Sequence, residues 1–215
     1  MIKTILSPFK NFAWFKRLNA KVSYELLAKY IPDADWHFMN YGYVPNAGEP
    51  ALDLPDNDPK VQKYPMQMYN CLASKVEVSG KQVLEVGSGR GGGARHIATT
   101  FKPASYTGLD LASNAVVLAN RIHHVPGLKF IQGSAESIPL QNDSIDVVLN
   151  VESCHAYGNV PKFLSEVKRV LKPGGHLLLV DFRYSHQMDE FFSYLPVAGF
   201  KFCQRKILLQ TLSGL

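Results

Sequence analysis

The fold of this chain is decided by a short stretch near its middle, EVGSGRGGG at residues 85–93. An apolar run leads into the acidic residue, and an apolar-periodic segment follows the glycines from Ala94 to Phe101. This order predicts a strand, a tight turn and the start of a helix. Because glycine has no Cβ, a ligand can lie against bare backbone at a helix N-terminus, where free N–H groups point outward. The stretch therefore predicts a site for a nucleoside-type cofactor.

Strands and helices alternate from Lys81 onward. Short apolar runs predict strands at 82–86, 105–110, 128–132, 145–151 and 175–181, and helical periodicity predicts helices at 91–100, 113–124, 160–171 and 186–195. This alternation implies right-handed βαβ units and a doubly wound, mostly parallel α/β sheet. We expect two regions, namely an N-terminal helical cap with an aromatic loop over residues 1–75, which includes a helix at 61–74, and a core domain over 76–215. A sixth strand is expected at 199–208.

The composition narrows the classes of function. With 215 residues, 46% of them hydrophobic, the chain can bury one sizeable core. Residues 1–21 hold five basic residues and no acid, and the remaining 18 basic residues (23 − 5) match 18 acidic ones. The chain after residue 21 thus has no net charge, which argues against a nucleic-acid partner. The three cysteines are far apart and have no metal-ligand spacing, which predicts a reduced, cytoplasmic protein without a metal site.

The basic head, residues 1–21, also contains four aromatic residues. Such a segment can rest on an anionic membrane near a lipid substrate, which would make the protein membrane-associated. A solvated tail, or a cap helix over the active site, is the alternative interpretation.

Polar residues follow each predicted strand, at the sheet edge where parallel sheets bind ligands. The glycines fit both G-x-G-x-x-G spacing (87, 89, 92) and the tighter G-x-G-x-G spacing (87, 89, 91). Asp110 ends the second strand, 23 residues past Gly87 (110 − 87), where a carboxylate can hold both hydroxyls of a ribose; a helix cap is the alternative. Gly133-Ser134-Ala135-Glu136 follow the third strand and suit an adenine edge, although a plain turn explains them equally well.

The fourth and fifth strands are followed by a candidate catalytic pair, His155 and Asp181. Adjacent parallel strands lie about 4.8 Å apart, so we expect the two side chains to be neighbours. A carboxylate there can hold the tautomer of an imidazole and stabilise its charged form. Simple packing or helix capping by His155, and a structural role for Asp181, are the alternatives.

The residues at 83–93, 108–110, 133–136 and the Leu-Lys-Pro-Gly-Gly turn at 171–175 together resemble the class I S-adenosylmethionine-dependent methyltransferases. Within that superfamily, residues 38–43, 53–55, 91–93, 103–111 and 150–155 are similar to the phthiotriolone/phenolphthiotriolone dimycocerosate methyltransferases, which O-methylate a lipid hydroxyl. The spacing of His155 and Asp181, 26 residues (181 − 155), is similar to that of the histidine–aspartate pair in natural-product sugar O-methyltransferases.

The resemblance implies S-adenosyl-L-methionine as the cofactor and assigns residues to its parts. The implied contacts are Gly87, Ser88, Gly89 and Gly91 at the methionine, Glu85 at its amino group, Asp110 at the ribose, Ala135 with Ser134 or Glu136 at the adenine, and Asn150 beside the sulfonium. Leu111 is also expected to contact the cofactor, and Tyr41 and Tyr43 to close the site. It also implies that His155 is a general base oriented by Asp181.

The sequence thus predicts a methyltransferase that O-methylates a hydroxyl of a small-molecule, lipid or glycolipid acceptor. Three alternatives stay open: N- or C-methylation, an NAD(P)-dependent oxidoreductase built on the same glycine turn, and a truncated methyltransferase-like domain that binds cofactor without turnover. The truncated-domain alternative stays open because similar proteins have further helices and a final strand after the sixth strand. We therefore expect the C-terminal strand pair of this chain to be incomplete.

Overall fold

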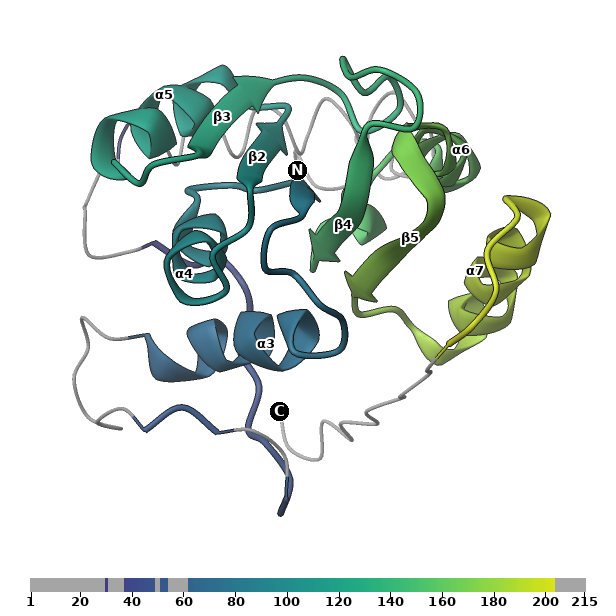
Figure 1. Ribbon diagram of the computed structural model, residues 1–215. Helices are drawn as coiled ribbons and strands as arrows, with labels where there is room; N and C mark the ends of the chain where they lie inside the picture. Colours follow the sequence, from purple (N-terminus) through teal and green to yellow (C-terminus); the bar gives the residue numbers. More distant parts are fainter. Residues whose placement is uncertain (1–29, 31–36, 49–50, 54–61, 204–215) are drawn as a thin grey trace, which may run out of the picture.

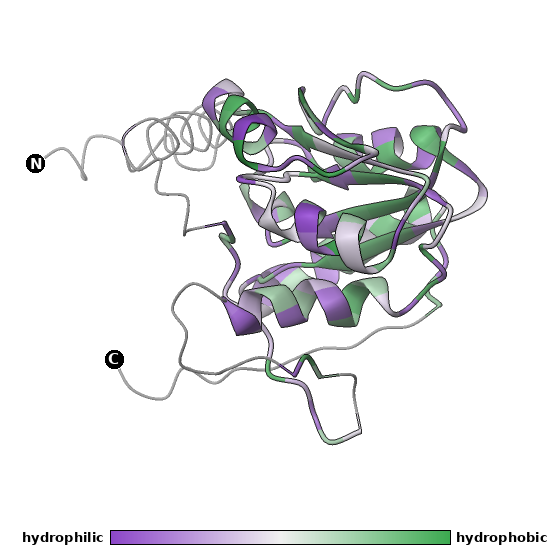
Figure 2. Ribbon diagram, turned by 60° about the vertical axis from the view of Figure 1, so that its left-hand side comes forward, coloured by the Kyte–Doolittle hydropathy of each residue, from purple (hydrophilic) through white to green (hydrophobic). Residues whose placement is uncertain are grey.

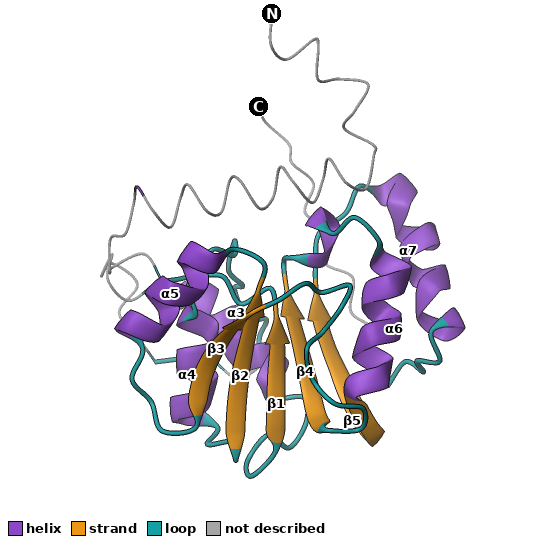
Figure 3. Cartoon of the chain, turned by 90° about the horizontal axis from the view of Figure 1, so that it is seen from above, coloured by secondary structure: helices purple, strands orange, loops and turns teal. Residues whose placement is uncertain are grey.

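The computed structural model describes residues 30, 37–48, 51–53 and 62–203. Its centre is a five-stranded sheet in the order β3-β2-β1-β4-β5, with every neighbouring pair parallel (Figure 3). The strands are β1 (Gln82–Val86), β2 (Ser105–Asp110), β3 (Leu128–Gln132), β4 (Ile145–Val151) and β5 (Leu171–Val180). The predicted fold class is confirmed, and the first four strands have the predicted bounds.

Helices flank the sheet on both faces (Figure 1). They are α3 (Lys63–Ala73), α4 (Gly92–Thr100), α5 (Ser113–Ile122), α6 (Val160–Val170) and α7 (Ser185–Val197), with a short 3-10 turn η2 (Cys154–Ala156) after β4. Each of the five helices lies within two residues of its predicted bounds at either end. The start of α6 is fixed locally, because the Asn159 side chain accepts a hydrogen bond from the N–H of Lys162 and Pro161 occupies the first turn.

Two hydrophobic cores lie on opposite faces of the sheet, because successive strand residues point to alternate sides. Val83 packs with residues of α3, α4 and α5, whereas Leu84 packs with residues of α6 and α7. Figure 2 shows hydrophobic residues concentrated in the strands, with hydrophilic residues on the outer helices. Helix α3, assigned from sequence to the cap region, contributes Tyr69 to the same core as Val83. The predicted division of the chain at residue 75 stays a prediction.

Strand β5 begins earlier than predicted. Ile145 pairs with Leu171 and Val147 pairs with His176, so the residues between Leu171 and His176 form an irregularity opposite Asp146. Gly174 has a φ of 79°, as a turn requires. The Leu-Lys-Pro-Gly-Gly turn therefore lies inside the paired region rather than before it, which corrects the predicted start at residue 175.

Several predictions fall partly or wholly outside the described residues. These are the helices of the first 36 residues, the basic head at 1–21, and the C-terminal strand pair. Residues 199–203, the described part of the predicted sixth strand, are not in a strand, so that part of the prediction is wrong. Within the described part of the chain, no helix is both long and apolar enough to cross a membrane.

Candidate functional site

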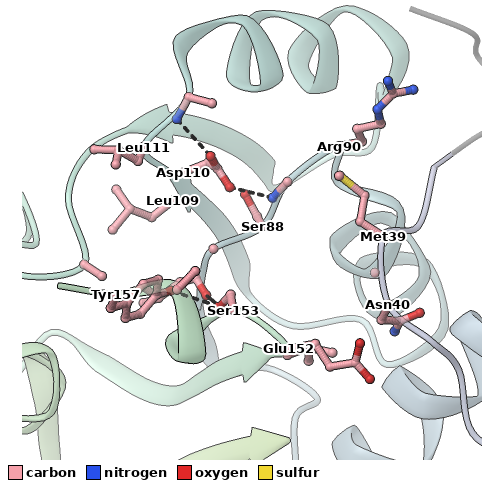
Figure 4. A pocket seen from close by; sticks show the side chains of 18 of the residues that line it. Met39, Asn40, Ser88, Arg90, Leu109, Asp110, Leu111, Glu152, Ser153 and Tyr157 are labelled. Carbon is pink, nitrogen blue, oxygen red and sulfur yellow. Dashed lines mark hydrogen bonds between the residues drawn. The ribbon is translucent and has the colours of Figure 1, made fainter. Parts of the chain in front are cut away.

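A cavity opens at the carboxyl ends of β1, β2, β3 and β4, around the point where the strand order reverses. Parallel sheets bind ligands at this position. Its walls come from the turn after β1, the ends of β2 and β3, the segment after β4, and residues 37–40 of the N-terminal region (Figure 4). The predicted site residues that line it are Gly87, Ser88, Gly89, Asp110, Leu111, Ser134, Ala135 and Glu136.

The turn after β1 is held by Asp110. One carboxylate oxygen accepts from the N–H of Gly89 at 2.7 Å, and the other accepts from the N–H of Ala112 at 2.9 Å (Figure 4). Gly87 and Gly89 have φ values of 79° and 52°, which glycine adopts without strain. A carboxylate oxygen has two lone pairs and can accept more than one hydrogen bond. Asp110 can therefore shape the turn and hold a diol together.

The glycines that begin α4 serve close packing. A Cβ on Gly91 would lie 2.4 Å from the Phe130 ring, and one on Gly93 would lie 2.1 Å from the Tyr69 ring. The N–H of Gly92 donates to the carbonyl oxygen of His37 at 3.2 Å, so this group is already engaged. Gly91, predicted to border the cofactor, is not a lining residue, because its backbone faces the Phe130 side chain.

Glu85 also lies away from the cavity lining. Its side chain is fully buried, and its carboxylate accepts from the hydroxyls of Tyr69 at 2.7 Å and Tyr106 at 2.9 Å. Burial raises the pKa of Glu85 to about 7, although the two tyrosine hydrogen bonds lower it. Tyr69 lines the cavity, so any effect of Glu85 on a ligand passes through this ring rather than through the predicted direct contact.

Asn150 is the centre of a buried polar cluster behind the cavity wall. Its side-chain amide lies 2.8 Å from the Val86 carbonyl oxygen, 2.8 Å from the Ser153 hydroxyl and 3.0 Å from the Tyr157 hydroxyl. A Cβ on Gly87 would lie 2.4 Å from the Ser153 oxygen, so the glycine permits this contact between β1 and β4. Ser153 and Tyr157 line the cavity and Asn150 does not.

His155 and Asp181 lie side by side, as their strand positions predicted. Val151 pairs with Val180 at the ends of β4 and β5, and Nδ1 of His155 lies 2.7 Å from Oδ1 of Asp181. The His155 side chain is 26% exposed and the Asp181 side chain 2% exposed. His155 does not line the cavity, but its neighbours Ser153 and Ala156 do. The pair therefore lies at the border of the cavity.

Two further side chains fix Asp181. Its second oxygen, Oδ2, accepts from the Cys154 thiol at 2.8 Å and from the Arg183 guanidinium at 3.2 Å. The charge of Asp181 is thus balanced by an arginine whose guanidinium carbon lies 4.3 Å from the centre of the Phe191 ring. Burial raises the pKa of the Cys154 thiol well above its ordinary value, so this thiol stays protonated and acts as a donor.

The part of the cavity wall that comes from the N-terminal region is formed by other residues than predicted. His37, Phe38, Met39 and Asn40 line the cavity, whereas Tyr41 and Tyr43 do not. Tyr41 is 83% exposed and meets the ring of Phe182 edge-on at 5.5 Å, while Phe182 packs against the His155 ring at 4.1 Å. The backbone N–H of Tyr41 donates to the Glu152 carboxylate at 3.0 Å. Tyr41 therefore lies near His155 through Phe182, and the N–H of Tyr43 donates to the Tyr64 carbonyl oxygen at 2.9 Å.

Sequence reasoning missed the lining residues His37–Asn40, Tyr69, Arg90, Glu152 and Ser153. The polar run after β4 was a signal for Glu152 and Ser153, because polar groups there need a cleft. No periodic or spacing signal marks residues 37–40, which reach the cavity only through tertiary packing.

The cavity fits a nucleoside carrying polar groups. The Ser88 hydroxyl is buried at its wall and has no hydrogen-bond partner among the described residues. A Cβ on Gly89 would meet only the Met39 sulfur, at 3.5 Å, so the glycine backbone faces open space. The Ser88 hydroxyl thus offers a hydrogen bond that no described residue uses.

Comparisons with known proteins agree with this geometry. A family model described as a methyltransferase domain matches residues 84–179. A fatty-acid O-methyltransferase of Mycolicibacterium smegmatis is 40% identical over 212 residues, which cover 94% of this chain and 76% of the relative. A phthiotriol/phenolphthiotriol dimycocerosates methyltransferase of Mycobacterium leprae is 38% identical over 190 residues, covering 88% and 69%.

Among solved structures, the [4+2]-cyclase SpnF has a TM-score of 0.71 over 86% of this chain and 72% of its own. At 20% identity this likeness concerns the fold alone. Because that protein is named a cyclase, the shared fold does not fix the reaction.

Proposed function

This chain belongs to the S-adenosylmethionine-dependent methyltransferases, and we propose that it transfers a methyl group to a hydroxyl oxygen of a lipid acceptor. The observation that carries the proposal is the contact between His155 and Asp181 at the border of the cavity. A hydroxyl is a weak nucleophile until a base takes its proton, so a positioned base fits this acceptor. The names of both relatives specify lipids, which supports a lipid acceptor. Only the phthiotriol name specifies a hydroxyl, because the accepting oxygen of a fatty acid belongs to its carboxyl group.

The chain's own groups account for cofactor binding in this proposal. Asp110 would hold the ribose hydroxyls, Ser88 and the backbone at Gly87 and Gly89 the methionine part, and residues 134–136 the adenine. Glu85, Gly91, Asn150, Tyr41 and Tyr43 would act indirectly, by shaping this lining. When bound, the cofactor supplies a methyl group on a positively charged sulfur, which leaves as a neutral thioether.

The hydrogen bond to Asp181 sets the proton positions on His155. A carboxylate oxygen only accepts, so Nδ1 carries a ring proton, and in the neutral ring Nε2 then presents a lone pair. Nε2 makes no hydrogen bond with any described residue. It would accept the acceptor's hydroxyl proton as the oxygen–methyl bond forms, and Asp181 would stabilise the charged imidazole.

The test is the substitution His155→Ala, measured by transfer of a labelled methyl group to a lipid extract. Turnover should fall by about 10²–10⁴-fold, the usual contribution of a positioned base. Affinity for S-adenosylhomocysteine, measured by calorimetry, should stay at the wild-type value, because His155 does not line the cavity. Full turnover in this variant would overturn the assignment of His155.

Asp181 acts through His155, so its test needs a readout that separates positioning from folding. Asp181→Asn should lower kcat while leaving KM for the acceptor and the cofactor affinity unchanged. Asp181→Glu, which restores a carboxylate, should recover part of the lost kcat. An equal loss in both variants, together with a lower unfolding temperature, would reduce Asp181 to a structural role.

A further inference from the structure

We propose that the carboxylate of Glu152 makes the cavity favour S-adenosylmethionine over its product, S-adenosylhomocysteine. This inference rests on the function proposed above and concerns exchange of the cofactor, not choice of the acceptor. The two molecules share the adenosine, the amino group and the carboxylate. They differ by one methyl group and by one positive charge on sulfur, so a negative charge in the cavity wall acts on their difference.

Glu152 lies at the end of the cavity proposed for the methionine part. It directly follows β4 and lines the cavity on the opposite side from Asp110, which is assigned to the ribose (Figure 4). The next residue, Ser153, donates to the Val86 carbonyl oxygen at 3.2 Å, immediately before Gly87. The sulfur joins the ribose to the amino-acid part of the cofactor, so Glu152 would face the half that carries the sulfonium.

The backbone of the protein fixes the position of Glu152. Its N–H donates to the Val180 carbonyl oxygen of β5 at 2.7 Å, and its Oε2 accepts from the N–H of Tyr41 at 3.0 Å. Its φ is 44°, an unfavourable conformation for a residue with a Cβ, and strain of this kind is enriched at functional sites. The carboxylate is thus held at the cavity wall before a ligand binds, as electrostatic preorganisation requires.

The charge of Glu152 is not neutralised by a cation in the described part of the chain. None of the ion pairs there involves Glu152, whereas Asp181 is paired with Arg183. Of the described lysines and arginines, only Arg90 lines the cavity, and Figure 4 shows its guanidinium well separated from Glu152. The negative charge of Glu152 therefore acts on whatever occupies the cavity.

Partial burial strengthens this action. Burial raises the pKa of Glu152, the Tyr41 N–H lowers it, the negative charge of Asp181 raises it and His155 lowers it. A positive charge in the cavity favours the ionised carboxylate, and the same attraction stabilises the bound cation. Because charges interact over about 10 Å where solvent screening is weak, the effect needs no direct contact with the sulfonium.

Methyl transfer removes the charge on which Glu152 acts. As the sulfur–methyl bond breaks and the oxygen–methyl bond forms, the electron pair stays on sulfur and His155 takes the hydroxyl proton. The product is a neutral thioether, which loses the attraction to Glu152. The wall charge therefore favours replacement of the product by a new molecule of S-adenosylmethionine.

The test measures both affinities by calorimetry, without acceptor and at about pH 8, in the wild type and in Glu152→Gln. Glutamine keeps an oxygen that can accept from the Tyr41 N–H but removes the charge. The ratio of the two affinities should shift toward S-adenosylhomocysteine by roughly 5- to 20-fold, the scale of two unit charges about 10 Å apart in a partly screened site. Affinity for S-adenosylhomocysteine itself should stay near the wild-type value.

Sinefungin separates the charge from the methyl group. In this analogue a carbon that bears an ammonium group replaces the methylated sulfur. Its affinity should fall in Glu152→Gln as that of S-adenosylmethionine does. A loss for S-adenosylmethionine alone would assign the effect to the methyl group and overturn the inference.

Glu77→Gln is the matched control. It alters an exposed carboxylate that accepts from the backbone N–H of Ser79 at 2.9 Å and does not line the cavity, so all three affinities should stay at wild-type values. An unchanged ratio in Glu152→Gln would overturn the inference. Equal losses for charged and neutral ligands would also overturn it, because Glu152 would then support only the shape of the cavity.

Failure of the proposed function gives a different result. If labelled methyl groups reach no alcohol in the lipid extract while Glu152→Gln still shifts the ratio, the hydroxyl proposal falls and the charge selection stands. If alcohols are methylated and the ratio does not change, only the charge selection falls.

Discussion

The two halves of the site are built by different means. At the ends of β1 and β2, glycines and backbone N–H groups set the geometry, with Asp110 as the one side chain that ties the turn together. At the ends of β4 and β5, side chains hold one another: His155 with Asp181, and Asp181 with Cys154 and Arg183. Substitutions in the first half should therefore act mainly through added side-chain volume. Substitutions in the second half should act mainly through changes in charge and protonation.

The two buried acids that follow this division show the contrast. Glu85 on β1 has tyrosine hydroxyls as partners and no cation among the described residues, so burial dominates and its pKa rises. Asp181 after β5 instead has an arginine partner beside its histidine.

The largest expected effect on the first half is that of Asp110→Ala. It would remove the proposed hydrogen bonds of a charged group to the ribose, worth about 1.5–3 kcal/mol each, and it releases the N–H groups of Gly89 and Ala112. Affinity for S-adenosylhomocysteine, measured by calorimetry, should fall by about 10²–10³-fold.

A control for this prediction is Asp146→Ala, an acid that also accepts from a backbone N–H, that of Gln82 at 2.8 Å. It lies near the start of β4, away from the cavity lining, so cofactor affinity should not change. Unchanged affinity in Asp110→Ala itself would contradict the ribose role.

The next effect is a pH dependence of stability from Glu85. Its pKa is about 7 in the folded protein against an ordinary value of 4.5. Between these values the folded state holds a proton that the unfolded state releases, so the free energy of unfolding should decrease as pH rises from about 4.5 to 7. The contribution is on the order of 3 kcal/mol, because one pKa unit corresponds to about 1.4 kcal/mol.

Urea unfolding at several pH values checks this, with Glu85→Gln as the comparison. The glutamine cannot ionise, so the decrease should be smaller in the variant by the Glu85 contribution. Parallel pH profiles for the two proteins would mean that Glu85 titrates alike in the folded and unfolded states, and the proposed contrast with Asp181 would lose its basis.

The sheet could be predicted closely because its signals are local. Strands β1 to β4 are short apolar runs between turn residues, and their parallel arrangement follows from the intervening helices. The start of β5 could not be predicted, since pairing of Leu171 with Ile145 across an irregularity is a property of two chain segments, not of one. The same applies to residues 199–203, whose apolar and aromatic content alone suggested a strand.

The sequence predicted those site residues that directly follow the carboxyl end of a strand. This rule found Asp110, Ser134 and the His155–Asp181 pair. Glu85 and Asn150, which the same rule assigned to the cofactor, do not line the cavity, because side chains alternate across a strand and the last strand residues can face the core. It could not find residues 37–40, which reach the cavity through contacts such as those of the Gln62 side chain with the His37 and Phe38 N–H groups.

The smallest expected effect tests whether volume governs the first half. Gly93→Ala places a Cβ 2.1 Å from the buried ring of Tyr69, whose hydroxyl is held by Glu85. Overpacking costs about 1–3 kcal/mol, and the better helix propensity of alanine offsets up to about 1 kcal/mol, so the free energy of unfolding should fall by about 1–2 kcal/mol. A double-mutant cycle with Tyr69→Ala isolates the cause. In that background the ring is gone, so Gly93→Ala should become neutral or stabilising; a persisting loss would place the steric limit elsewhere in α4.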